Sequence, residues 1–151
     1  MDFLILDIEK HLIDMRDITS DKERPAIQRG FLMVDFVVLQ RIIKEIESHS
    51  SVQDAAIVSR SGMHVAGEVP RGAHMETYVA MSAILLGAAE SATSELHDRL
   101  KYILVQLEEG KLVLAPAGKR ALVVIKSTAD ANSQELSEMV RNFSDQIEKA
   151  I

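Results

Sequence analysis

The sequence contains no cysteine and no tryptophan, and aromatic residues make up only 4% of its 151 residues. The absence of cysteine excludes a disulfide framework, thiolate-bound zinc, iron–sulfur clusters and a cysteine nucleophile. The scarcity of aromatic residues argues against base-stacking platforms and aromatic ligand cages. Basic residues number 17 against 23 acidic ones, which gives a net charge of −6. Because nucleic-acid binding relies on clustered Lys and Arg, this balance argues against a nucleic-acid partner.

Long apolar runs are missing as well. The longest uncharged stretch, Thr77 to Ala89, falls far short of the roughly 20 apolar residues that a membrane-spanning helix needs. The first residues include an acid and lack the cationic segment of a signal peptide. We therefore expect a cytoplasmic protein with no membrane insertion. The chain is nevertheless 47% hydrophobic, and a domain of this length typically buries about 68–70% of its unfolded surface.

Residues 1–18 carry apolar side chains at helical spacing, with charged residues between them. The polar, proline-containing stretch 18–30 that follows indicates a linker. We therefore expect an N-terminal amphipathic helix and linker over residues 1–32, followed by a domain over residues 33–151. The apolar stripe is a candidate partner-binding surface, in which a helix lies in a groove of another protein. Its residues are Leu4, Ile8, Leu12 and Met15.

The rest of the chain alternates between helical and β-strand patterns. Expected helices cover residues 35–48, 75–96 and 132–151, and expected strands cover 55–59, 63–69, 102–107, 112–115 and 121–125. Asn132 can cap the last helix, and Gly62 can supply a positive φ in the turn after the first strand. Because consecutive strands are joined by short connections, we expect antiparallel pairing within each group. The fold class is α+β, in the order helix, two strands, helix, three strands, helix.

No arrangement of residues points to catalysis. Gly110 and Gly118 are separated by seven residues instead of the four of a phosphate-binding loop, and Arg120 replaces the required Ser or Thr. The histidines lack the short helical spacing of metal ligands, and no serine lies in a nucleophile-elbow pattern. We therefore expect no cofactor, no metal and no enzyme activity, with a small-ligand pocket as the weakest alternative. Four arginines near turns are interpreted as surface charges and not as an arginine finger: Arg60, Arg71, Arg99 and Arg120.

The helix expected at 75–96 is rich in small residues. Gly87 lies inside it, and a helical Gly costs about 1 kcal/mol relative to Ala, so it calls for a packing reason. Two explanations stay open: the helix packs closely on its own sheet, or it packs both on the sheet and on a second copy of itself. The expected apolar stripe of this helix consists of Tyr78, Met81, Leu85, Ala88, Ala92 and Leu96.

The strand expected at 102–107 is apolar on both faces. At a sheet edge it would carry unpaired backbone groups, and pairing with its own copy would satisfy them. Together with the small-residue helix it defines a candidate dimer interface. The interface residues are Met81, Ala83, Ile84, Gly87, Ala88, Ser91, Tyr102, Ile103, Leu104 and Val105.

Four local strings, taken in order, resemble a known family. They are Val52–Gly62, Met81–Glu90, Glu109–Leu114 and Asp130–Asn132. Over residues 36–151 the chain resembles the Roadblock/dynein light chain domain, which includes LAMTOR and MglB-type regulators. The resemblance implies a three-layer α/β/α fold with a five-stranded antiparallel sheet, the middle helix on one face and the first and last helices on the other.

The resemblance also implies a dimer in which the middle helices meet and the third strands join two sheets. Family members are non-catalytic platforms that bind or regulate Ras-like small GTPases, or adaptor subunits of larger assemblies. The leading hypothesis is therefore a homodimeric regulator or scaffold for a small Ras-like GTPase. The alternative is a structural adaptor that assembles a larger complex through its N-terminal helix.

Overall fold

Three helices and five strands follow one another in the computed structural model, which describes residues 34–151. Their order, helix, two strands, helix, three strands, helix, confirms the prediction. The stripe of Leu4, Ile8, Leu12 and Met15 lies outside the described residues. The elements are α3 (Phe36–Glu47), β1 (Val52–Ser59), β2 (His64–Gly67), α4 (Met75–Ser94), β3 (Ile103–Gln106), β4 (Lys111–Ala117), β5 (Ala121–Ser127) and α5 (Ser133–Ala150).

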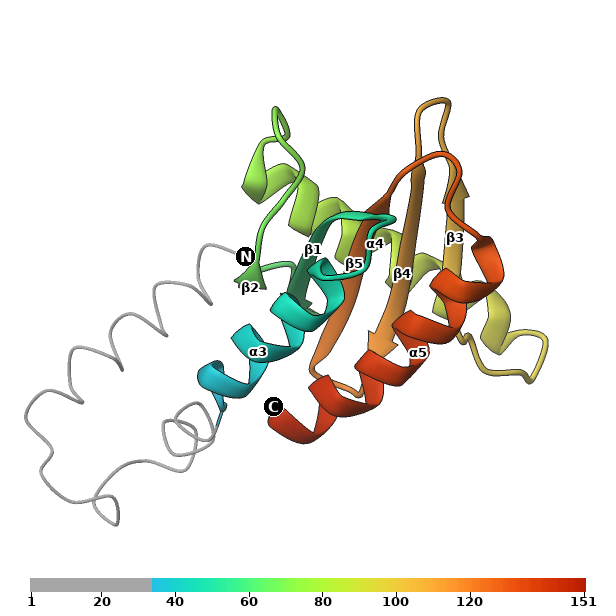
Figure 1. Ribbon diagram of the computed structural model, residues 1–151. Helices are drawn as coiled ribbons and strands as arrows, with labels where there is room; N and C mark the ends of the chain where they lie inside the picture. The colour runs from blue at the N-terminus through green and yellow to red at the C-terminus, as the bar shows by residue number, and fades with distance from the viewer. Residues whose placement is uncertain (1–33) are drawn as a thin grey trace, which may run out of the picture. The chain divides into compact units, whose positions relative to one another are not determined.

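The five strands form one antiparallel sheet in the order β2-β1-β5-β4-β3 (Figure 1). The predicted antiparallel pairing is confirmed. The central strand β5 is buried from Ala121 to Ile125, whereas β3 and β2 lie at the two edges. β3 therefore occupies the edge position on which the dimer hypothesis depends.

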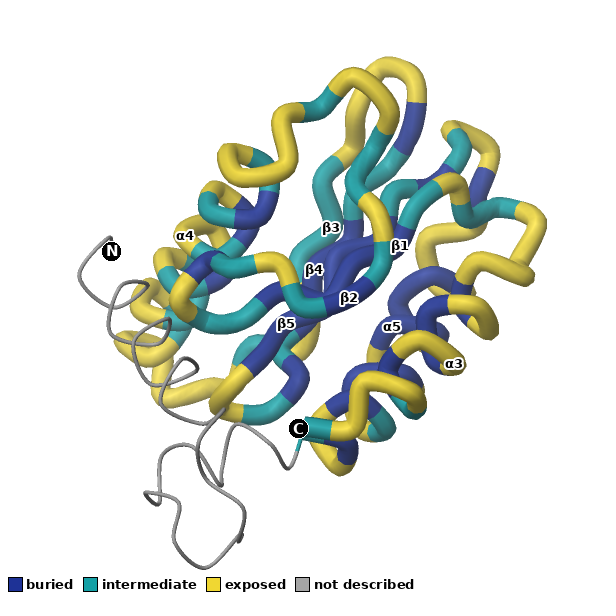
Figure 2. Tube along the Cα trace, turned by 90° about the vertical axis from the view of Figure 1, so that its left-hand side faces the viewer, coloured by how far each residue is buried: buried dark blue, intermediate teal, exposed yellow. Residues whose placement is uncertain are grey.

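Helices cover both faces of the sheet. α4 lies on one face, and α3 and α5 pack side by side on the other, so the fold is the predicted three-layer α/β/α arrangement (Figures 1 and 2). In Figure 2 the buried residues gather in the sheet and on the sides of α3 and α5 that face it.

The two helices on the α3/α5 face follow from strongly amphipathic sequences. In α5, the side chain of Asn132 accepts hydrogen bonds from the backbone N–H groups of Gln134 (2.9 Å) and Glu135 (3.1 Å), which confirms the predicted cap. The apolar stripe of this helix is buried as its periodicity predicts. It consists of Leu136, Met139, Val140, Phe143 and Ile147. In α3 the buried stripe includes Leu39, while Val38 is only half-buried.

Several element ends differ from the sequence prediction, and two of them have a clear physical reason. β4 was expected to end at residue 115, but it continues to Ala117, with Pro116 paired to Leu122 of β5. The pairing of β3 with β4 ends at Leu114, so Pro116 lies where β4 has a neighbour on one side only, a position that tolerates the missing N–H. α4 ends at Ser94, and three residues later His97 takes a left-handed φ of 54° that turns the chain back.

The β1–β2 turn packs against α4. Gly62 has a φ of +88°, as its position in the turn predicts, and a Cβ at this residue would lie 3.1 Å from the Cα of Ala80. The turn therefore needs glycine for its backbone conformation and for its close approach to the helix.

Candidate functional site

α4 is held to the sheet along one narrow stripe. Only three of its 20 residues are buried, against eight of 18 in α5. The three are Val79, Ser82 and Leu86, and the two apolar ones join a core cluster with residues of β1, β4 and β5. The Ser82 hydroxyl donates to the Tyr78 carbonyl at 2.7 Å, so its burial leaves no polar group unsatisfied.

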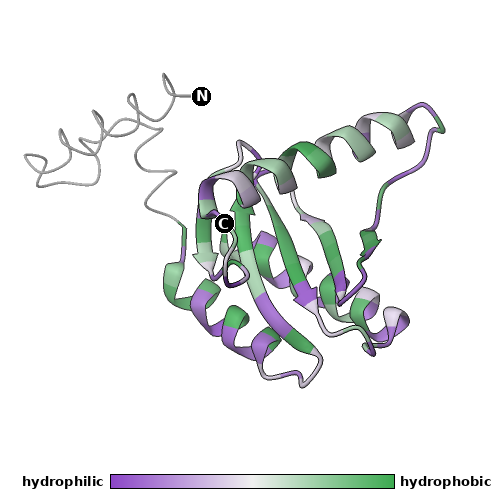
Figure 3. Ribbon diagram, turned by 90° about the horizontal axis from the view of Figure 1, so that it is seen from above, coloured by the Kyte–Doolittle hydropathy of each residue, from purple (hydrophilic) through white to green (hydrophobic). Residues whose placement is uncertain are grey.

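Apart from Tyr78, which packs on the core cluster, the apolar stripe expected for this helix does not face the sheet. Met81 is 55% exposed, Leu85 is 40% exposed and Leu96, beyond the end of the helix, is 74% exposed. The physical reason is that α4 is apolar on both sides: no charged residue occurs from Thr77 to Ala89 (Figure 3, where α4 is green to white over most of its length). Helical periodicity selects a packing face only when the other face is polar.

The outer face of α4 is therefore an exposed apolar surface. Met81, Ile84, Ala88 and Ser91 follow one another at spacings of three or four residues. Leu85 lies four residues after Met81, and all five are exposed. Contiguous exposed apolar surface on a water-soluble domain marks sites of interaction with proteins or membranes. Leu85 is missing from the sequence-based interface set, although it belongs to the expected apolar stripe.

The small residues of α4 have two different explanations. Ala80 and Ala83 give room to the β1–β2 turn, since a Cβ on Gly62 would come within 3.8 Å of the Ala83 side chain. Ala83 is half-buried and packs on the core cluster, so it belongs to the inner face and not to the outer one. At Gly87, by contrast, a Cβ would meet no described atom within 4 Å. Packing on its own sheet therefore does not explain Gly87.

β3 presents a second unpartnered feature. It pairs with β4 from Ile103 to Gln106, and no described strand lies along its other edge. Ile103 and Val105 are half-buried against the core cluster beneath α4, and Leu104 is half-buried. Tyr102 precedes the strand and is 37% exposed. The structure thus leaves the edge strand and the outer face of α4 open together.

Arg60 is not the solvated surface charge that the sequence suggested. Its Nη1 donates to the Glu90 carboxylate, and its Nη2 donates to the other Glu90 oxygen at 3.3 Å and to the Gly118 carbonyl at 2.9 Å. Its backbone N–H donates to the Arg120 carbonyl at 2.9 Å. These bonds join the end of β1 and the β4–β5 turn to α4. Arg71, Arg99 and Arg120 are exposed, as predicted.

Near the start of β1 and the end of β2, two acids have raised pKa values, Asp54 and Glu47. Partial burial and the negative charge of Glu68 raise the pKa of Asp54, against the opposing charge of Lys126. Burial, Glu68 and Asp54 raise the pKa of Glu47 in the same way. Burial of the Tyr78 ring against the core cluster, and secondarily the Asp54 charge, raise the pKa of Tyr78 to about 12. Glu47, Asp54 and Glu68 are mutually repulsive carboxylates. Within residues 34–151, no set of three His, Cys, Asp or Glu side chains is placed to hold a metal ion.

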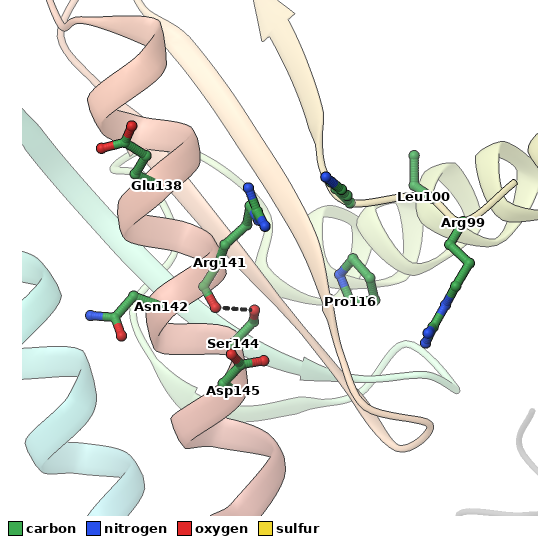
Figure 4. A pocket seen from close by; sticks show the side chains of 9 residues that line it. Arg99, Leu100, Pro116, Glu138, Arg141, Asn142, Ser144 and Asp145 are labelled. Carbon is green, nitrogen blue, oxygen red and sulfur yellow. Dashed lines mark hydrogen bonds between the residues drawn. The ribbon is translucent and has the colours of Figure 1, made fainter.

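Two open clefts lie on the α5 side of the sheet. A cleft of about 580 Å³ lies between α5 and the segment that leads into β3, with Pro116 in its lining (Figure 4). A second, of about 550 Å³, lies between α5 and the end of α3, where the rings of His49 and Phe143 meet edge to face at 6.4 Å. Among the described helices, none is long and apolar enough to cross a membrane.

Comparison with known proteins places this architecture in a family. A model of the Roadblock/LC7 domain matches residues 38–127, and the chain belongs to the Roadblock/LC7 domain family. Uncharacterized protein MJ0714 of Methanocaldococcus jannaschii is 28% identical over 89 residues, which cover 58% of this chain and 75% of that protein.

Solved structures share the fold. The gliding protein MglB from Thermus thermophilus superposes with a TM-score of 0.69 at 18% identity, over 76% of this chain and 89% of that one. A structure described as MglB with tetrameric arrangement gives a TM-score of 0.67 at 17% identity, over 76% of this chain and 87% of the other. The sequence resemblance and the predicted fold class are therefore confirmed.

Proposed function

We propose that the protein is a non-catalytic regulator or scaffold that acts as a homodimer and binds a small Ras-like GTPase. The observation that carries the proposal is the outer face of α4, where Met81, Ile84, Leu85, Ala88 and Ser91 are exposed around Gly87. A second copy is the occupant of this face, because one apolar stripe can meet itself across a two-fold axis. Gly87 then allows close approach of two helix backbones.

The edge strand supports the same assembly. In a two-fold dimer, β3 of one copy can pair antiparallel with β3 of the other, which satisfies the free backbone groups of Ile103–Gln106. The proposed interface thus combines the outer face of α4 with β3 and includes Leu85. Ala83 is left out, because it packs on the core of its own chain.

A small GTPase is the proposed partner because Roadblock-type proteins are known as platforms for such enzymes. The described residues offer no catalytic group of their own, and the guanidinium of Arg60 is already bonded to Glu90 and Gly118. The protein would therefore act on its partner by holding switch segments in one conformation, and not by inserting an arginine into the nucleotide site.

The test is to measure nucleotide exchange and single-turnover GTP hydrolysis of the small GTPases encoded beside the gene, with and without the purified protein. We expect a stable complex and a change in one of the two rates. Ile84→Arg serves as the matched variant, since it places a charge on the exposed α4 face without touching the core. If the wild-type dimer forms no complex and leaves the exchange and hydrolysis rates unchanged, the GTPase role is contradicted, while the proposed homodimer is unaffected.

A second candidate role is that of a structural adaptor that assembles a larger complex through residues 1–32. The family match begins only at residue 38, and the stripe of Leu4, Ile8, Leu12 and Met15 precedes it. Deletion of residues 1–32 separates the two roles. Loss of a co-purifying partner with GTPase binding retained would favour the adaptor role for this segment, and an unchanged set of partners would remove it.

A further inference from the structure

The edge strand β3 is flanked by opposite charges. Arg99 and Lys101 precede it, and Glu108 and Glu109 follow it in the turn to β4. All four side chains are exposed. A strand that is cationic before its first residue and acidic after its last is complementary to an antiparallel copy of itself, because that copy runs in the opposite direction. In a parallel pairing the same charges would meet their own kind.

The cationic end of β3 adjoins the cleft of about 580 Å³. Arg99 and Lys101 line one side of it, and Arg141 of α5 lines the other. Figure 4 shows the Arg141 guanidinium pointing toward the strand side, while the Glu138 carboxylate points away from it. Glu138 and Asp145 are the acids in the lining, so cations outnumber acids by three to two. In a chain of net charge −6 this is a local excess of positive charge.

The cleft lies at the edge of the sheet. β3 pairs with β4 only as far as Ile103 opposite Leu114, whereas Pro116 of β4 lines the cleft two residues further on. A chain that is added along the outer edge of β3 therefore passes the mouth of the cleft as it leaves the strand.

Symmetry limits the register of such an added strand. A two-fold axis perpendicular to the sheet leaves every side chain on its own face, and residues that face each other across antiparallel strands also share a face. The axis must therefore pass midway between one residue of the strand and the same residue of the second copy. With the axis at Leu104, Arg99 comes opposite Glu109 of the second copy. With the axis at Val105, Lys101 comes opposite Glu109 of the second copy.

We propose that the acidic turn Glu108–Glu109 of a second copy docks against Arg99, Lys101 and Arg141, and that this contact restricts the antiparallel β3 pairing to the registers with the axis at Leu104 or Val105. The inference rests on the proposed homodimer and adds to it the residues that determine which strand is accepted. The contact forms twice in the dimer. It favours the copy with complementary ends and opposes edge strands that bring like charges together.

Charge reversal tests the contact with two variants. In the cation variant, Arg99→Glu and Lys101→Glu place acids opposite acids, and in the acid variant, Glu108→Lys and Glu109→Lys place cations opposite cations. We expect the homodimer dissociation constant of each to rise by about tenfold or more at low ionic strength, and the effect to shrink in high salt. An equimolar mixture of the two should restore most of the lost affinity, because residues 99 and 101 of each copy then face residues 108 and 109 of opposite charge, and only one Arg141 faces a like charge.

The control reverses two exposed cations on a different helix, Arg41→Glu with Lys44→Glu on α3. This control makes the same change in net charge as the cation variant, and we expect wild-type dimerisation. Sedimentation velocity with one fluorescently labelled species distinguishes homodimers from the mixed dimer.

The outcomes distinguish the proposed register of the β3 pairing from the proposed homodimer. Weak homodimers that recover on mixing support the register. Variants that dimerise as wild type does, or that stay dissociated when mixed, overturn it and leave the α4 contact standing. A wild-type protein that is monomeric in the same experiment overturns the homodimer itself.

Discussion

α4 and α5 cover opposite faces of the same sheet and differ in how much of their apolar surface is buried. α5 is amphipathic and buries one full side, from Leu136 to Ile147, while its other side carries charged residues. α4 is apolar on both sides, and only Val79, Ser82 and Leu86 are buried. Within residues 34–151, α5 therefore buries its full apolar side, whereas α4 leaves one apolar side exposed.

The largest expected effect comes from matched isoleucines on the two faces. Ile147→Ala removes a fully buried side chain of α5 and should lower the free energy of unfolding by about 2–5 kcal/mol. Ile84→Ala changes an α4 residue that is 55% exposed, so the unfolding free energy of the monomer should change by no more than about 0.5 kcal/mol. Urea denaturation at protein concentrations below the dissociation constant of the dimer measures both variants as monomers. Equal losses would contradict the contrast.

A second comparison uses two glycines, Gly67 in β2 and Gly87 in α4. Gly67 has a φ of +84°, and a Cβ there would lie 2.2 Å from the Ala55 carbonyl oxygen, so Gly67→Ala should destabilise the fold by more than about 2 kcal/mol. Gly87→Ala fills open space in a helix and should stabilise the monomer by about 1 kcal/mol. Thermal unfolding followed by circular dichroism compares the two variants. A destabilised Gly87→Ala monomer would indicate an intrachain contact at Gly87 that residues 34–151 do not make.

The Arg60–Glu90 pair tests how firmly α4 is attached. Glu90→Ala leaves the guanidinium without its carboxylate, and we expect a loss of roughly 1 kcal/mol, which is modest because about a third of the Glu90 side chain is exposed. A double-mutant cycle with Arg60→Ala measures the coupling between the two residues by chemical denaturation. Additive losses would mean that the pair contributes nothing beyond its separate contacts.

The smallest effect concerns Asp54. Its pKa is raised by burial and by Glu68, so in the folded protein its charged form is disfavoured. The penalty is fully present above the folded pKa and disappears as the pH falls below the unfolded pKa. Asp54→Asn should therefore raise stability near pH 7 by up to about 0.5 kcal/mol, and its advantage over wild type should shrink as the pH approaches about 4. Denaturation at a series of pH values follows the difference, and an advantage that grows in acid would reverse the assigned sign.

Local signals in the sequence predicted most of the fold. Asn132 and the stripe that follows it specify α5, and Gly62 specifies the turn after β1, because each acts on its immediate neighbours. Pro116 misled the strand prediction, since whether a proline fits a strand depends on where the adjacent strand ends. The same limit applies to α4, where both sides are apolar and periodicity alone does not choose the buried one.

The contacts of the site depend on residues that are distant in the sequence. Arg60 bonds to Glu90 and Gly118, which lie 30 and 58 positions away in the sequence, and no local sequence pattern predicts these bonds. The outer α4 face and β3 were both identified from sequence as interface candidates, because small residues inside a helix and a strand apolar on both faces are local features. The inward orientation of Ala83 and the exposure of Leu85 required the three-dimensional arrangement.

The most direct test of the account is the mass in solution of the full chain and of Ile84→Arg, measured by sedimentation equilibrium at micromolar concentration. We expect about twice 16.7 kDa, or a multiple of that dimer, for the wild type, and 16.7 kDa for a folded Ile84→Arg variant. A wild-type mass of 16.7 kDa, or a variant that keeps the wild-type mass, would contradict the claim that the outer face of α4 binds a second copy.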